Sequence, residues 1–138
     1  MGKLRESAAS LGFFGDDLDP REITAALGSE PSVGVRTGEL WRTGSGAEKV
    51  AVTGSWRISA ERRTPGDLDG QINDILNGLS DDFSAWRLFS QRYRGRVFCG
   101  LFLASENDGL TLRSETVARL GQRGLLIELD IYSPDDPT

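Results

Sequence analysis

The chain contains a similar helix boundary near each end, and this pattern restricts it to folds that alternate strands with short helices. Near the N-terminus, residues 15–20 (Gly-Asp-Asp-Leu-Asp-Pro) lead to Glu22 and to a closing Leu-Gly at 27–28. Near the C-terminus, Ser114 starts a segment that closes with Leu-Gly at 120–121. Asp and Ser cap helix starts, proline suits the first turn, and glycine ends helices. The first segment also has the spacing of an Asp-x-x-Glu capping box.

The remaining elements follow from hydrophobic periodicity. The interval 106–109 (Glu-Asn-Asp-Gly) is typical of a hairpin turn, with 110–112 pairing back. The stretch 30–38 has loop composition, and 43–47 is the most flexible-looking part of the chain. The predicted strands are 7–14, a short edge strand at 39–42, 50–59, 97–104 and 125–132, and the predicted helices are 20–27, 67–79, 83–93 and one from 114.

This order predicts the fold class. Short α/β units mixed with an antiparallel hairpin favour an α+β single-domain sandwich, in which helices pack on a mixed, largely antiparallel sheet of ferredoxin-like character. The recurring helix boundary is consistent with two related halves. Because it depends on few positions, coincidence remains the alternative.

The 138 residues suit one domain, with a core over about 7–133 and short polar termini. Cys99 is the single cysteine, so an internal disulfide or a multi-cysteine metal site is excluded. The N-terminus lacks the apolar core of a signal peptide, and no apolar run approaches the length of a membrane span. We expect a cytoplasmic protein with no membrane partner.

The formal net charge is -5. Negative charge opposes binding to a polyphosphate, so nucleic acid is an unlikely partner. Another protein is the partner class that we expect. An exposed edge strand could also pair two copies, and the oligomeric state therefore stays open.

Catalytic motifs are scarce. The chain has no histidine, which excludes histidine-based triads and histidine-ligated metals, and it has no phosphate loop, dinucleotide fingerprint or nucleophile elbow. Asp16, Asp17 and Asp19 could attract a hard cation, but Pro20 and Glu22 favour a turn followed by a helix cap. We therefore expect no metal and no cofactor.

The last predicted strand supplies candidate binding residues. Glu128, Asp130 and Tyr132 alternate with apolar residues and so share one sheet face, where paired carboxylates could perform acid–base work. On the strand at 50–59, Trp56 faces one side and Arg57 the other. If that strand is adjacent, Trp56 and Arg57 complete a polar groove. The alternative is a solvated sheet face.

Arginines also gather near aromatic residues between the third predicted helix and the strand at 97–104. This arrangement could bind nucleic-acid bases and phosphates, but the aromatic residues fall on the helix's core stripe, which favours a solvated helix end. The cluster consists of Arg87, Arg92, Arg94 and Arg96 with Phe89, Tyr93 and Phe98.

An ordered set of positions resembles a known family. The set comprises the segment 15–28 described above, Pro31-Ser32, Gly38, residues 55–59 (Ser-Trp-Arg-Ile-Ser) and residues 129–132 (Leu-Asp-Ile-Tyr). It is similar to the bacterial domain-of-unknown-function family 4279, over about residues 11–133. The resemblance implies a small cytosolic bacterial domain with no established activity and no established catalytic residues.

Two functional hypotheses follow. The first is a non-catalytic protein-interaction or binding module, of which an immunity-protein-like role is one example. The second is a small ligand-binding domain or enzyme that uses Glu128, Asp130, Tyr132 and Arg57 on the sheet face. Acidic charge and the lack of catalytic motifs favour the first.

Overall fold

The computed structural model describes residues 2–134. Its main sheet has five strands in the order β3-β6-β2-β7-β9. Two small two-stranded sheets pair β1 with β8 and β4 with β5. The strands are β1 (Gly2–Lys3), β2 (Glu6–Gly15), β3 (Val33–Val35), β4 (Leu40–Arg42), β5 (Glu48–Val50), β6 (Gly54–Ser59), β7 (Arg94–Phe102), β8 (Asp108–Gly109) and β9 (Leu126–Tyr132), and the helices are α1 (Pro20–Leu27), α2 (Leu68–Asn77), α3 (Phe83–Arg92) and α4 (Ser114–Gln122).

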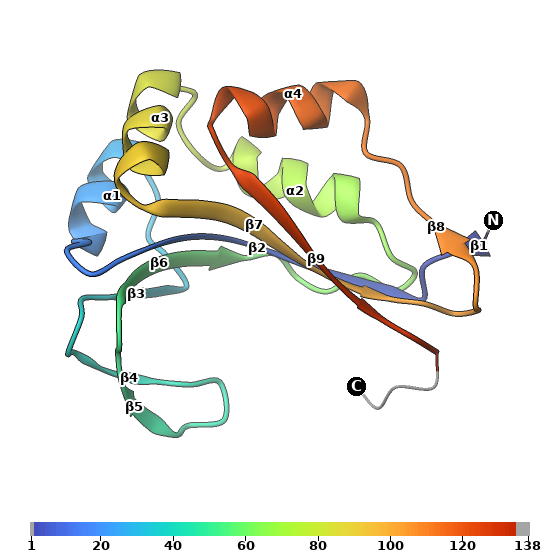
Figure 1. The fold of residues 1–138 in the computed structure, drawn as a ribbon, viewed down its shortest axis with the longest axis horizontal. Helices are drawn as coiled ribbons and strands as arrows, with labels where there is room; N and C mark the ends of the chain where they lie inside the picture. The colour runs from blue at the N-terminus through green and yellow to red at the C-terminus, as the bar shows by residue number, and fades with distance from the viewer. Residues whose placement is uncertain (1, 135–138) are drawn as a thin grey trace.

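The main sheet is mixed and largely antiparallel. β2 pairs antiparallel with both β6 and β7, and β3 with β6, while β9 runs parallel to β7. Figure 1 shows the helices on one side of this sheet and the β4–β5 hairpin on the other. The predicted α+β sandwich, with helices packed on one face of a mixed sheet, is confirmed.

The hydrophobic core lies between the sheet and the helices. Leu11 and Phe13 of β2 and Trp56 of β6 have no exposed surface. The Phe13 ring lies 6.0 Å from both Trp86 and Phe89 of α3, measured between ring centroids. These aromatic contacts fix the helical layer to one sheet face and leave the opposite face without a helix.

Local capping explains α1, and the predicted helix is confirmed with the same limits. The Asp19 carboxylate accepts the backbone N–H of Arg21, Pro20 occupies the first turn, and Gly28 ends the helix with φ of 82°. The reciprocal contact of a capping box is not formed, because the Glu22 carboxylate accepts a hydrogen bond from Arg92 at 2.6 Å. The acidic turn therefore caps a helix and anchors α3.

The hairpin predicted at 106–109 is wrong. The Asp108 carboxylate accepts the backbone N–H groups of Ala104 and Ser105, which closes a local turn instead. The chain then pairs β8 in parallel with β1. The return strand predicted at 110–112 is absent from the described secondary structure.

The region 30–59 also differs from the prediction. Val33–Val35, within the expected loop, forms the edge strand β3 beside β6. The predicted strand 50–59 is divided, because β5 pairs with β4 and only β6 joins the main sheet. The flexible-looking segment 43–47 makes the turn of the β4–β5 hairpin, where the Thr43 N–H donates to the Ala47 carbonyl.

One edge of the main sheet is formed by β9, whose helix-side residues Ile127, Leu129 and Ile131 are exposed. In the described part of the chain, no helix combines the length and the apolar character needed to cross a membrane. The expected polar termini include residue 1 and residues 135–138, which lie outside the described residues.

Cys99 provides a simple test of the core. The side chain is fully buried on β7, and burial raises the pKa of its thiol to about 12. Since the thiolate is the reactive form, we expect no reaction with a thiol reagent such as Ellman's reagent at pH 8 in the native protein, and rapid reaction of one thiol in urea. Rapid labelling of the native protein would contradict the described packing.

Candidate functional site

The sheet face opposite the helices, here called the open face, carries the candidate site. Residues of β2 alternate between the two faces, so Leu11 and Phe13 point to the core while Gly12 and Phe14 point to the open face. The registers extend this assignment to the neighbouring strands. The open face is formed by Ala8, Ser10, Gly12 and Phe14 of β2, Ser55, Arg57 and Ser59 of β6, Arg96, Phe98, Gly100 and Phe102 of β7, and Glu128, Asp130 and Tyr132 of β9.

Arginine and aromatic side chains stack across this face. The guanidinium carbon of Arg96 lies 4.8 Å from the ring centroid of Phe14 and 5.0 Å from that of Phe98. The Phe102 and Tyr132 rings are stacked, with centroids 4.8 Å apart and an interplanar angle of 7°. Planar cations over aromatic rings form a rigid surface that loses little conformational entropy on binding.

The candidate residues of β9 share the open face. Glu128 accepts hydrogen bonds from Arg94 at 2.5 Å and from Arg96 at 3.2 Å. The Arg94 hydrogen bond, with the nearby charges of both arginines, holds the pKa of Glu128 below its ordinary value. The Tyr132 hydroxyl donates to the Asp130 carboxylate. Glu128 is thus held as an anion and is poorly suited to donate a proton near neutral pH.

The Glu128 pKa predicts a pH dependence of stability. A carboxyl whose pKa is lower in the folded state stabilises the fold above its unfolded pKa of about 4.3, and this contribution disappears as the pH falls through the folded pKa. Glu128→Gln removes the effect. We therefore expect the difference in unfolding free energy between wild type and variant, from urea titrations, to be largest at neutral pH and to shrink below about pH 4.

Glu106→Gln is the matched control, because Glu106 is exposed and makes no ion pair within the described residues. Its effect on unfolding free energy should stay small and nearly constant across the same pH series. An equal pH dependence in both variants would contradict the role assigned to the Glu128 pair.

Trp56 lies on the other face of the sheet. Its side chain has no exposed surface, and the indole N–H donates to the Thr24 hydroxyl of α1 at 3.0 Å. The structure therefore brings together Arg57, Glu128, Asp130 and Tyr132 on one face and separates Trp56 from them. Arg57 is on β6, with β2 and β7 between it and the β9 residues.

A cleft lies where the β4–β5 hairpin meets the open face, and we call it the hairpin cleft. Its volume is about 260 Å³. The Arg57 guanidinium lies 4.9 Å from the Trp41 ring centroid. Trp41 and Lys49 are cross-strand neighbours, so both project from the same face of the hairpin. The lining residues are Phe14, Val35, Trp41, Lys49, Val50, Ala51, Val52, Thr53, Ser55 and Arg57.

The two cations of the hairpin cleft have no acidic partner. Neither Arg57 nor Lys49 forms an ion pair with any described residue, and no carboxylate lines the cleft. The Arg57 Nε is buried without a hydrogen-bond acceptor, whereas its terminal nitrogens are partly exposed and make no hydrogen bond to a described residue. Burial, and then the charge of Arg96, lowers the pKa of Arg57. The cleft is a cationic site in an acidic protein.

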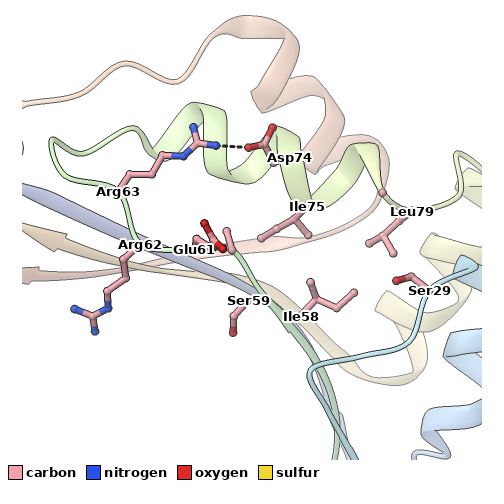
Figure 2. A pocket seen from close by; sticks show the side chains of 11 residues that line it. Ser29, Ile58, Ser59, Glu61, Arg62, Arg63, Asp74, Ile75 and Leu79 are labelled. Carbon is pink, nitrogen blue, oxygen red and sulfur yellow. Dashed lines mark hydrogen bonds and ion pairs between the residues drawn. The ribbon is translucent and has the colours of Figure 1, made fainter. Parts of the chain in front are cut away.

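A second cavity, of about 410 Å³, differs from the hairpin cleft because its arginines have acidic partners. It lies between β6 and α2, where Ile58 and Ile75 form apolar walls (Figure 2). In Figure 2 Arg63 points toward Asp74 and is joined to it by an ion pair, while Arg62 points away. Arg62 pairs with Glu6 at 2.8 Å. Both arginines at this cavity are thus paired within the protein, and the lining charge without an ion pair among the described residues is the carboxylate of Glu61, so the cavity offers a ligand no unpaired cation.

The sequence reasoning did not identify Trp41, Lys49 or Phe14 as site residues. Trp41 and Lys49 lie on a hairpin whose docking against Arg57 is a long-range contact with no local sequence pattern. Phe14 was assigned only to a strand. The sole pattern that could have indicated them is the pair of β-type segments on either side of the Gly-rich turn 43–47.

Comparison with protein families identifies the chain. The family model for the domain of unknown function DUF4279 matches residues 4–134. The chain belongs to the DUF4279 family. The predicted resemblance is thereby confirmed, and the matched range of the DUF4279 domain includes the main sheet, the helices and the hairpin cleft. No curated protein and no solved structure matches the chain.

Proposed function

We propose that this DUF4279 protein is a non-catalytic, cytoplasmic interaction module of bacteria and that its open face binds another protein. The observation that carries the proposal is the helix-free sheet face, on which arginines stack with aromatic rings beside the hairpin cleft. Trp, Tyr and Arg dominate the binding energy of protein interfaces. An immunity-protein-like role is one form of this function.

The hairpin adds exposed apolar surface beside the same face. The exposed fractions of Leu40, Val50 and Val52 are 68%, 59% and 90%. Three such side chains on this short hairpin and just after it favour contact with a protein surface. At about 260 Å³, the hairpin cleft is smaller than the roughly 300 Å³ at which small-molecule pockets usually begin, so a side chain of a larger partner fits it better than a metabolite.

Other partner and reaction classes have less support. Glu128 pairs with both Arg94 and Arg96 and offsets one of their two charges, and Glu6 pairs with Arg62, which leaves few cations on this face for the phosphates of a nucleic acid. The alternative of a small ligand-binding domain or an enzyme would use Glu128, Asp130 and Tyr132. The arginine pair on Glu128 and the Tyr132–Asp130 hydrogen bond favour a structural use of these groups.

Affinity purification of the full chain from the cells that naturally produce it tests the proposal. We expect one protein partner at near-equal stoichiometry with the wild type, and at least about tenfold less of it with Trp41→Ala, because removal of a buried interface tryptophan costs 2 kcal/mol or more. Leu88→Ala truncates an exposed apolar side chain of α3 in the helical layer and should retain the partner. Absence of a stoichiometric partner, or equal recovery with all three proteins, would overturn the proposal.

A further inference from the structure

We infer that the hairpin cleft is a carboxylate-binding site and that it takes a Glu or Asp side chain of the partner protein. The inference rests on the proposed function and specifies the chemistry that its surface recognises. It is carried by the unpaired guanidinium of Arg57, held over the Trp41 ring with its terminal nitrogens open to solvent.

The position of Arg57 is fixed before any ligand binds. Its stem crosses Gly12 of β2, where an added Cβ would lie 3.3 Å from the Arg57 Cγ and 2.7 Å from the Phe14 ring. The Trp41 ring covers the guanidinium at 4.9 Å. A planar guanidinium held by aromatic stacking presents its N–H groups as a fixed fork, which matches the two oxygens of a carboxylate.

The pairing of charges in the protein also supports an anionic ligand at Arg57. The protein pairs Arg96 with Glu128, Arg62 with Glu6 and Arg36 with Asp19, yet it leaves Arg57 and Lys49 without acids among the described residues. Desolvation and the neighbouring Arg96 make the environment of Arg57 unfavourable for its charge, as its lowered pKa indicates. A bound anion would relieve this cost, and Lys49 lies across the hairpin ladder from Trp41 to add a second cation.

The size of the cleft and its other walls distinguish a carboxylate side chain from other anions. Val35, Val50 and Val52 line the cleft and suit the methylene groups of Glu or the backbone that carries it. A phosphoryl group would set more oxygen atoms against these apolar walls than a carboxylate does, and each oxygen left without a donor carries a desolvation cost. The geometry therefore favours a side-chain carboxylate over a phosphoryl group.

The test uses the full chain and side-chain NMR signals of arginine. The probe is a blocked glutamate, N-acetyl-glutamate N-methylamide, with the blocked glutamine as its neutral counterpart and inorganic phosphate as the competing anion. We expect saturable shifts of the Arg57 guanidinium and Trp41 indole signals, with at least about tenfold weaker binding of the glutamine compound.

Variants complete the experiment. Arg57→Gln should weaken glutamate binding at least about tenfold, while Arg42→Gln, which makes the same charge change on the outer side of the hairpin, should leave it within about twofold. A dispersed amide spectrum verifies that each variant is folded. Equal binding of glutamate and glutamine, tighter binding of phosphate, no shift with glutamate, or unchanged affinity in Arg57→Gln would each overturn the inference.

The two proposals fail separately. If blocked glutamate does not bind but recovery of the partner still depends on Trp41, the carboxylate site is wrong and the protein-binding face stands. If no partner is recovered, the proposed function itself is wrong.

Discussion

Trp56→Ala should lower the free energy of unfolding by about 3–5 kcal/mol, the range observed when a large core aromatic is truncated. Trp56 has no exposed surface, and its ring lies 6.3 Å from that of Phe13, between centroids. Its indole N–H also donates to the Thr24 hydroxyl. The substitution leaves a cavity between the sheet and α1 and removes that hydrogen bond. Urea denaturation monitored by circular dichroism measures the change.

Trp41→Ala is the matched control for this prediction. Trp41 is only half-buried, on the small β4–β5 sheet, and should cost about 1 kcal/mol or less because its removal opens no enclosed cavity. A larger loss from Trp41 than from Trp56 would contradict the division between core face and open face. The comparison therefore tests which tryptophan serves folding and which is available for binding.

Gln71→Ala should lower the free energy of unfolding by about 2–4 kcal/mol through lost hydrogen bonds and a cavity. Gln71 of α2 is fully buried. Its amide N–H₂ donates to the carbonyls of Ser7 at 2.9 Å and Glu61 at 2.8 Å, and its oxygen accepts from the Ser7 hydroxyl at 2.5 Å. The buried Ser7 hydroxyl loses its acceptor and the Ser7 carbonyl keeps only the Arg63 backbone N–H, so urea denaturation should show a midpoint well below that of the wild type.

Asn77→Ala is the control for Gln71. Asn77 is on the same helix and exposed, and its carbonyl oxygen accepts one hydrogen bond from Arg119. We expect its substitution to change the unfolding free energy by about 0.5 kcal/mol or less. If Gln71→Ala were equally mild, the buried network between β2 and α2 would not be a principal anchor of that helix.

Local patterns explain what the sequence predicted correctly. Helix α1 follows from Asp19, Pro20 and Gly28, each of which acts within a few residues of its own position. Alternation likewise placed Trp56 and Arg57 on opposite faces and put Glu128 with Tyr132 on a shared one. Caps and side-chain alternation are short-range properties, so one chain suffices to identify them.

The features that the sequence did not predict depend on long-range contacts. Alternation separates the two faces of β6 but does not say which of them the helices cover. The sequence therefore allowed Trp56 as a binding residue, whereas the structure buries it in the core. The β4–β5 hairpin folds back so that Trp41 lies on Arg57 of β6, and β8 pairs with the distant strand β1 and not with a hairpin partner. The cationic cleft exists only because of that docking.

Site-specific photo-crosslinking in the producing cells tests the central claim, that the open face binds a protein partner at the hairpin cleft. A photoreactive phenylalanine analogue is placed at Val52, on the rim of the cleft, or at Leu88, exposed on α3 in the helical layer. We expect a single crosslinked protein from position 52 and none from position 88. Crosslinking from position 88 alone, or from neither position, would contradict the account.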